Sequence, residues 1–265
     1  MSKIEIYVAY HNDSRRFQNN FLTPIFVGKN SASEELKCKL SDMIGDDTGE
    51  NISSKNQNYA ELTAMYWIWK NSKADYKGLF HYRRFLNFKD NEKFFEENDA
   101  DFMDKIGNKE EYKVVIEDND LMLPKIYHFH EYMTIYEQYD FAHNIKDLNI
   151  ALEILDEKYP KMTEHTKHIV HNYRKMYTCN LFVAKKEIYD DAMQWLFDIL
   201  FELEKRIDVS TYDEQNKRVF GFLSERLLTI YFTYLIENQD VKYTELPVAM
   251  LYPKAEWELK IKGKP

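Results

Sequence analysis

Glycine, proline and cysteine are all scarce in this sequence. Its 265 residues include seven glycines, six prolines and two cysteines. No glycine-rich phosphate loop, nucleophile elbow or zinc-protease motif occurs. Cys38 and Cys179 lack CxxC spacing, which argues against a disulfide framework or a structural zinc site and fits a reducing, cytoplasmic location. No segment rich in glycine, proline or serine divides the chain, and no internal repeat is evident.

The chain also lacks a net positive charge and long apolar runs. The formal net charge is −9, so a nucleic-acid partner, which needs a basic surface, is not expected. The first residues alternate polar and apolar and do not resemble a signal peptide. The most apolar later segment, residues 227–236, is shorter than the roughly 20 apolar residues that cross a bilayer. These features predict a cytoplasmic protein and leave peripheral contact with the inner face of the membrane open.

Aromatic residues are abundant by contrast. The chain has 20 tyrosines and 17 phenylalanines, and 44% of its residues are hydrophobic. Most of these side chains should pack in a substantial core, and a few exposed rings would offer flat surfaces for stacking bases or sugars.

The first half of the chain alternates predicted strands and helices. Residues 3–10 alternate as a strand does and end in a polar group. Asn58 and Glu61 have the spacing of a capping box, which predicts a helix that continues to about residue 71. Further elements are expected as a strand at residues 76–80, a charged helix within 91–105 and strands at 112–116 and 121–124.

The second half is mainly helical by the same criteria. Apolar stripes predict helices around residues 148–159 and 188–207, and residues 222–236 are apolar almost all round, as in a buried helix. A strand is expected at residues 178–184. The simplest organisation is one α/β domain over residues 1–265, with a sheet-containing half to about residue 125 and a helical half at 126–265.

The strongest chemical signal is the run His81-Tyr82-Arg83-Arg84 at the end of a predicted strand. Ligands of open α/β sheets bind beyond the carboxyl ends of the strands, and forked guanidinium groups match phosphate oxygens. The run could therefore hold a diphosphate and stabilise its negative charge. Surface ion pairs with some of the 45 acidic residues explain the arginines equally well.

Two acidic clusters carry weaker signals. The residues 46–49, with Asp47, could bind a ribose, a sugar hydroxyl or a metal, but an ordinary turn is favoured. Asp118 and Asp120 form an Asp-x-Asp, an arrangement that suits Mg²⁺ or Mn²⁺, or a solvated turn. The histidines at positions 165, 168 and 171 drift around a helix and do not form a metal-binding face.

Glu225 lies in an otherwise apolar predicted helix, where an unpaired carboxylate would be costly. It could be a general base that deprotonates a hydroxyl, with its pKa tuned by burial. The residue pattern itself slightly favours a structural role, as an acidic residue in the first helical turn or as a partner for Arg226.

Four longer blocks resemble a known family. They are residues 47–56, 61–71, 78–85 and 218–227. These blocks are similar to those of a bacterial glycosyltransferase family, first catalogued as a domain of unknown function and found in capsule, O-antigen and lipopolysaccharide gene clusters. The resemblance runs nearly end to end. It implies a variant of the GT-A fold, and some members of the family are associated with galactofuranose transfer from a UDP donor.

The resemblance also implies roles for individual residues. In the general GT-A pattern a helix and a strand lead to a metal-binding Asp-x-Asp, whereas here they lead to His81, Tyr82 and Arg83. Cationic side chains would then replace the metal at the donor diphosphate, so no cofactor is favoured, and Mn²⁺ or Mg²⁺ at Asp118 and Asp120 is the alternative. The remaining placements are Tyr10 and His11 near the base or ribose, Asp47 and Asn51 near the donor, and Asn180, Glu225 and Arg226 near the transferred sugar or acceptor.

The sequence therefore predicts an α/β, GT-A-like glycosyltransferase with a helical C-terminal half. It would move a hexosyl group, such as galactofuranose, galactose or glucose, from a UDP-sugar to a growing capsule, O-antigen or lipopolysaccharide glycan. We expect the glycan to be lipid-linked and presented at the cytoplasmic membrane face. A non-catalytic sugar- or nucleotide-binding protein and a sugar-nucleotide hydrolase are the alternatives.

Overall fold

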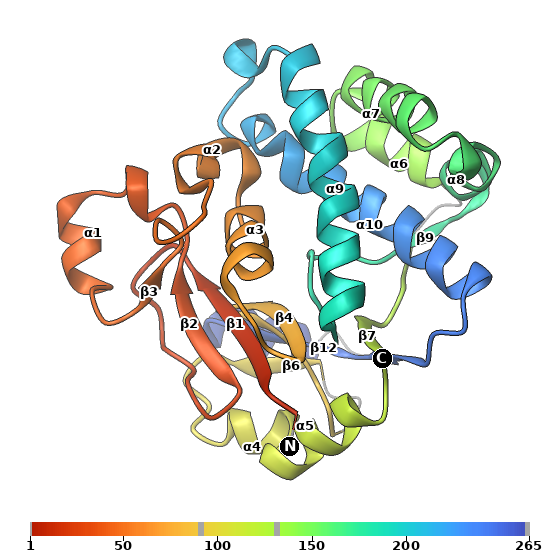
Figure 1. Ribbon diagram of the computed structural model, residues 1–265. Helices are drawn as coiled ribbons and strands as arrows, with labels where there is room; N and C mark the ends of the chain where they lie inside the picture. Colours follow the sequence, from red (N-terminus) through yellow and green to blue (C-terminus); the bar gives the residue numbers. More distant parts are fainter. Residues whose placement is uncertain (1, 90–92, 130–132, 263–265) are drawn as a thin grey trace.

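The computed structural model describes residues 2–89, 93–129 and 133–262. Their centre is one mixed sheet with helices on both faces (Figure 1). The strands follow the spatial order β11-β7-β10-β4-β1-β2-β3, with β5, β12 and β6 branching from β4. Their bounds are β1 Ile4–Tyr10, β2 Leu22–Phe26, β3 Ile44–Gly45, β4 Tyr76–His81, β5 Arg84–Leu86, β6 Phe94–Glu96, β7 Leu121–Pro124, β10 Phe182–Lys185, β11 Tyr243–Leu246 and β12 Val248–Tyr252. A separate pair joins β8 Tyr127–His128 to β9 Lys175–Met176.

Strand direction determines where a ligand can bind. The four neighbours β3, β2, β1 and β4 are parallel, so their carboxyl ends lie at the same edge of the sheet. Strand β10 runs antiparallel to both β4 and β7, which brings the chain just before Phe182 to that same edge. The edge therefore combines the ends of β1 and β4 with the loop that precedes β10.

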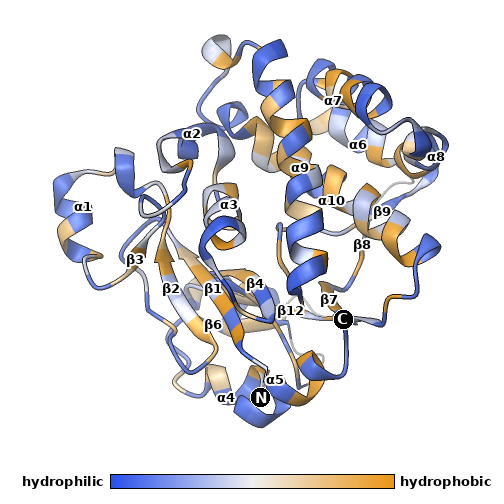
Figure 2. Ribbon diagram, in the orientation of Figure 1, coloured by the Kyte–Doolittle hydropathy of each residue, from blue (hydrophilic) through white to orange (hydrophobic). Residues whose placement is uncertain are grey.

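Both faces of β1 are buried because its side chains alternate between two hydrophobic clusters. Ile4, Ile6 and Val8 belong to one cluster, and Tyr7 and Ala9 to the other. The strand predicted at residues 3–10 is confirmed. Figure 2 shows hydrophobic residues gathered on the strands, whereas hydrophobic and hydrophilic residues alternate along the covering helix α9.

The helices form two unequal layers. The larger layer, from the second half of the chain, packs with α3 on one face, while α4 and α5 cover the other. Their bounds are α1 Glu34–Lys39, α2 Asn56–Tyr59, α3 Leu62–Asn71, α4 Phe102–Ile106, α5 Lys109–Glu117, α6 Ile135–Ala142, α7 Ile145–Lys158, α8 Thr163–Asn172, α9 Lys186–Arg206, α10 Val219–Asn238 and α11 Lys254–Lys262. Short 3-10 turns are η1 Lys29–Ser31, η2 Ser53–Lys55, η4 Pro160–Met162, η5 Val209–Thr211 and η6 Asn216–Arg218.

Helix α10 is the buried apolar helix expected from the sequence, and it is longer than residues 222–236. The stretch Asn216–Asn238 is long and apolar enough to cross a membrane by composition, yet 67% of its most apolar window is buried inside the protein. A core helix passes the same test, and α10 packs against α8 and α9 as such a helix does.

Two predictions in the first half are wrong. Residues 112–116 are part of helix α5 instead of a strand, because Asn108 and Glu111 form a capping box and Tyr112 and Ile116 face the core one turn apart. The expected helix within residues 91–105 is instead strand β6, a turn and the short helix α4; residues 90–92 lie outside the described part.

Candidate active site

Two adjoining cavities lie at the edge where β1 and β4 end. We call them the inner chamber, of about 190 Å³, and the outer chamber, of about 490 Å³. The inner chamber is lined by Glu61, His81, Arg84, Cys179, Arg218, Gly221, Phe222 and Glu225. The outer chamber shares Glu61, His81, Arg84 and Arg218 and adds Ala9, His11, Val27, Asn56, Gln57, Ala60, Tyr82, Arg83 and Glu214.

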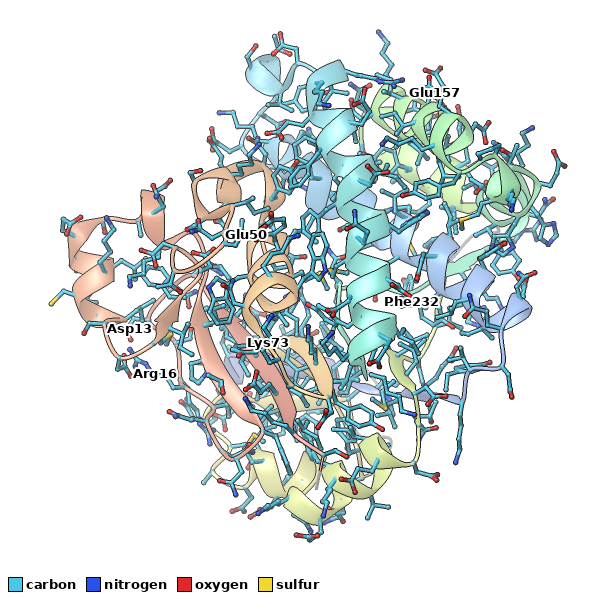
Figure 3. All side chains as sticks on the ribbon, viewed as in Figure 1. Asp13, Arg16, Glu50, Lys73, Glu157 and Phe232 are labelled. Carbon is cyan, nitrogen blue, oxygen red and sulfur yellow. The ribbon has the colours of Figure 1, made fainter. Side chains whose placement is uncertain are left out.

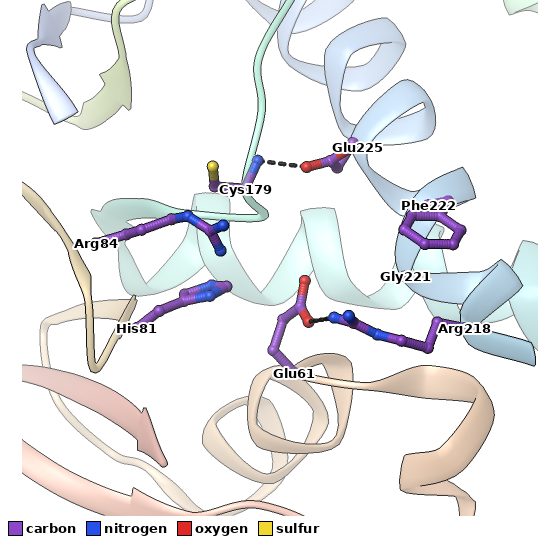
Figure 4. A pocket seen from close by; sticks show the side chains of 8 residues that line it. All are labelled: Glu61, His81, Arg84, Cys179, Arg218, Gly221, Phe222 and Glu225. Carbon is purple, nitrogen blue, oxygen red and sulfur yellow. Dashed lines mark hydrogen bonds and ion pairs between the residues drawn. The ribbon is translucent and has the colours of Figure 1, made fainter. Parts of the chain in front are cut away.

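The β4–β5 turn supplies the cationic wall of both chambers. His81 ends β4, Arg84 begins β5, and the two residues face each other across the strand pair. Directly opposed residues of an antiparallel pair project to the same face, so the imidazole and the guanidinium enter the cavity side by side (Figure 4). The structure thus brings together His81, Tyr82, Arg83 and Arg84 at the outer chamber.

Arg83 is exposed and Arg84 is half-buried, but among the described residues neither forms the surface ion pair that the sequence allows. Arg16 pairs with Asp13 and Asp42, and Figure 3 shows Arg16 and Asp13 close together at the edge of the molecule. Within the described residues, neither Arg83 nor Arg84 is within ion-pair distance of a carboxylate. Each guanidinium therefore keeps donors that a bound anion can use.

The two histidines of the site contribute hydrogen-bonding capacity and not positive charge. His81 is 9% exposed, and burial lowers its pKa to about 4. Burial also lowers the pKa of His11, and Arg218 and Arg83 lower it further. Both imidazoles are neutral near pH 7, so the positive charge of the four-residue run comes from its arginines alone.

Glu225 enters the inner chamber from the first turns of α10. Its Oε1 accepts a hydrogen bond from the backbone N–H of Cys179 (Figure 4), and its Oε2 lies 3.1 Å from Nη1 of Arg226. Burial raises the pKa of Glu225, and the positive charge of Arg226 offsets part of that rise. The carboxylate is thus held in place and partly desolvated, as a general base needs to be.

The inner chamber has a second carboxylate, Glu61, that the sequence did not assign to the site. Its Oε1 accepts a 2.7 Å hydrogen bond from Nδ2 of Asn180, and its Oε2 lies 3.6 Å from Nη2 of Arg218. Asn180 is held in turn by Ser224 Oγ and by the carbonyl of Gly221. Asn180 therefore orients Glu61 and lies behind the chamber wall. The sequence did contain a signal for this pair, because Glu61 and Arg218 are the first residues of two of the family-like blocks. The capping-box spacing from Asn58 instead suggested that Glu61 has only a structural role at the start of a helix.

Three residues with strained backbone flank these carboxylates. Ala60, Cys179 and Asn180 are the non-glycine residues with positive φ in the described chain, at 50°, 74° and 47°. Such conformations cost about 1–3 kcal/mol each and persist where the surrounding structure enforces them. Ala60 ends α2 and sets the direction of Glu61, so the helix predicted to begin at Asn58 is divided here into α2 and α3.

We expect Ala60→Gly to stabilise the fold by about 1 kcal/mol, because glycine adopts φ 50°, ψ −130° without strain. Thermal denaturation should show a melting temperature about 2–4 °C higher. Ala64→Gly, in the middle of α3, is the matched control and should lower it. A fall of similar size for Ala60→Gly would show that Ala60 is unstrained.

Three residues predicted to contact the donor do not line either chamber. Tyr10 is buried, and its hydroxyl joins the N–H of Phe17 to the carbonyl of Arg15. Oδ1 of Asp47 lies 3.6 Å from Nζ of Lys29, and Nδ2 of Asn51 donates a hydrogen bond to the backbone carbonyl of Asp47. These contacts stabilise the core and an ordinary turn.

Three further predicted residues, Arg226, Asp118 and Asp120, do not line either chamber. Arg226 is buried behind Glu225, where it donates to Gln138 and to the carbonyl of Phe222. Asp118 and Asp120 lie at the amino end of β7, at the opposite edge of the sheet, because β7 is parallel to β4. Asp118 pairs with Lys242 and Asp120 with Lys185.

No group of three or more potential ligands suited to a metal ion occurs among the residues that the structure describes. The acidic side chains that line the two chambers, Glu61, Glu214 and Glu225, are each bound to a cation or an N–H donor instead.

Comparisons with known proteins identify a matching family and a similar solved structure. The profile of the family described as Domain of unknown function (DUF4422) matches residues 5–238. A solved structure described as "WbbM bifunctional glycosytransferase apo structure" is similar with a TM-score of 0.85 and 34% sequence identity, over 94% of this chain and 45% of that chain. This chain thus spans less than half the length of that protein. The search of curated proteins found no match. The expected α/β, GT-A-like fold is confirmed.

Proposed function

We propose, from the premise that this chain belongs to the family described as Domain of unknown function (DUF4422), that it is a glycosyltransferase using a sugar nucleotide. The observation that carries the proposal is Arg84. Its guanidinium has no carboxylate partner among the described residues, and it lines both chambers beside two anchored carboxylates. The similarity to a bifunctional glycosyltransferase supports the same activity class.

The outer chamber suits the nucleoside diphosphate. It lies at the carboxyl ends of parallel strands, and its volume of about 490 Å³ is within the range of about 300–1,000 Å³ typical of small-molecule sites. Arg83 and Arg84 would bind the diphosphate oxygens, while the rings of His11 and Tyr82, 5.2 Å apart, offer surfaces for the base or ribose.

The reaction follows from the groups around the inner chamber. An acceptor hydroxyl oxygen attacks the anomeric carbon and loses its proton to Glu225, while the bond from that carbon to the diphosphate oxygen breaks. Arg84 and Arg83 stabilise the negative charge that grows on the leaving diphosphate. The raised pKa of Glu225 makes its conjugate acid a weaker acid, so the carboxylate is a stronger base than an exposed one.

The substrate classes extend this proposal. We propose that the donor is a UDP-hexose, with galactofuranose, galactose and glucose as candidate sugars, and that the acceptor is a lipid-linked capsule, O-antigen or lipopolysaccharide glycan at the cytoplasmic membrane face. A thermal-shift screen over UDP-, GDP-, CMP- and dTDP-sugars identifies the donor, since a ligand of the folded state raises the melting temperature. UDP release that requires acceptor indicates a transferase; release without acceptor indicates a hydrolase, and binding without release a non-catalytic protein.

Binding of UDP is expected not to require a divalent ion, because arginines face the proposed diphosphate position. Isothermal titration in EDTA and again with added Mn²⁺ should give similar dissociation constants. Binding that occurs only with Mn²⁺ would contradict the assignment of Arg83 and Arg84 as the diphosphate clamp.

A further inference from the structure

The inner chamber is too small for a nucleotide and has the composition of a sugar site. Its volume, about 190 Å³, is below the range that holds drug-sized ligands, so it accommodates about one ring. Two carboxylates and an imidazole provide hydrogen-bonding groups. Phe222 supplies the aromatic wall and is held by a stacked His143, with ring centroids 4.2 Å apart. The negative face of such a ring attracts the weakly positive C–H groups of a sugar.

The lining of this chamber includes a buried polar atom that has no hydrogen-bond partner within the described residues. Nε2 of His81 is buried and makes no hydrogen bond within the described residues. Buried polar atoms are almost always paired, so an unpaired one that borders a cavity indicates a missing ligand group. In Figure 4 the His81 ring points into the chamber between Arg84 and Glu61.

The chemistry of that atom distinguishes two ligand groups. A hydroxyl can pair with this nitrogen in either tautomer of the neutral imidazole, because a hydroxyl both donates and accepts, whereas a diphosphate oxygen can pair only with the tautomer in which Nε2 carries the proton. Glu61 beside it keeps lone pairs that can accept from a second hydroxyl, because Asn180 and Arg218 occupy only part of its capacity.

We infer that the inner chamber is the subsite of the transferred hexosyl ring and that Nε2 of His81 hydrogen-bonds one of its hydroxyl groups. His81 is then a specificity-determining residue and not part of the diphosphate clamp to which the sequence assigned it. The inference rests on the proposed function, and it identifies the residue that recognises a hydroxyl group of the donor sugar.

The low pKa of His81 supports this role. Burial is its main cause, and the charged or titratable groups that act on the ring are Glu61, Arg84, Arg218 and His11. Glu61 raises the pKa, and the other three lower it. The ring thus keeps one protonation state between about pH 6 and 8, so its contribution to sugar binding should not change over that range.

The test uses UDP and the UDP-hexose that the wild-type chain transfers, together with versions of that donor lacking one ring hydroxyl each. We expect the wild type to reject one deoxy donor by on the order of 10⁴-fold in kcat/KM, as sites built around a hydroxyl do. His81→Phe should use the full donor and that deoxy donor at similar low rates, while its dissociation constant for UDP stays close to that of the wild type. His81→Gln, which keeps a hydrogen-bonding group, should recover part of the discrimination.

His11→Phe is the matched control, since His11 lines only the outer chamber. It should alter UDP affinity and leave the deoxy-donor pattern unchanged. The inference is overturned if His81→Phe weakens UDP as much as the full donor, or if discrimination survives in a folded His81→Phe. A wild type that neither binds nor turns over any UDP-hexose would instead overturn the proposed function.

Discussion

Glu225→Gln is expected to lower the kcat of transfer by about 10²–10⁴-fold, the usual contribution of a general base. Glutamine has nearly the same shape and can still accept the hydrogen bond from the N–H of Cys179, but it cannot take a proton from the acceptor hydroxyl. UDP lies in the outer chamber in our proposal, so its affinity should stay nearly unchanged. Initial rates of UDP release and isothermal titration of UDP measure the two effects.

The pH profile gives an independent check on Glu225. Its pKa is raised by burial, so kcat should rise with pH as the carboxyl loses its proton, with a midpoint above that of an ordinary glutamate. Glu225→Gln should lack this limb. Glu237→Gln, at the exposed end of the same helix, is the control and should behave as the wild type. Rapid turnover by Glu225→Gln would return Glu225 to a structural role and make Glu61 the candidate base.

Arg84→Met should reduce kcat/KM by about 10²–10³-fold, the effect of removing one preorganised group that stabilises transition-state charge. Methionine fills a similar volume but provides no donor, so the leaving diphosphate loses a guanidinium within the chamber wall. Arg84→Lys should recover only part of the loss, because an ammonium group lacks the forked geometry. Steady-state kinetics over a series of donor concentrations measures the change.

Arg16→Met serves as the control for Arg84. Arg16 pairs with Asp13 and Asp42 outside both chambers, so its loss should leave kcat/KM unchanged. Equal effects of the two substitutions would indicate a general loss of charge or stability. Full activity in Arg84→Met would mean that the diphosphate binds elsewhere.

The sequence predicts well the elements whose pattern and burial agree. Strands β1 and β4 and helices α9 and α10 appear close to where alternation or apolar stripes indicate them. Helix α5 was mistaken for a strand because Val114, Val115 and Ile116 are β-branched and adjacent. Val114 is 65% exposed, so this run is not the buried strand that its composition favours.

Residues of the site could be predicted only where they lie at the end of a clearly predicted strand. His81, Arg83 and Arg84 follow a clear strand, and their meeting place follows from sheet geometry. Tyr10 has the same local context, yet its ring turns into the core, and no sequence pattern separates the two cases. Glu61 reaches the chamber because Ala60 adopts an unusual conformation, which depends on tertiary contacts and not on local propensity.

The residues that line the two chambers come from distant parts of the chain, and their order has a consequence for biosynthesis. His11 directly follows β1 and His81 ends β4, so both leave the ribosome early. Arg218, Phe222 and Glu225 arrive with η6 and α10, after the intervening helices. A nascent chain that has already formed β1 and β4 therefore still lacks one side of the inner chamber. If the site binds a sugar nucleotide as we propose, recognition of the donor sugar requires that α10 has packed into place. A cellular sugar nucleotide would then stabilise finished copies of the protein and not partly synthesised ones.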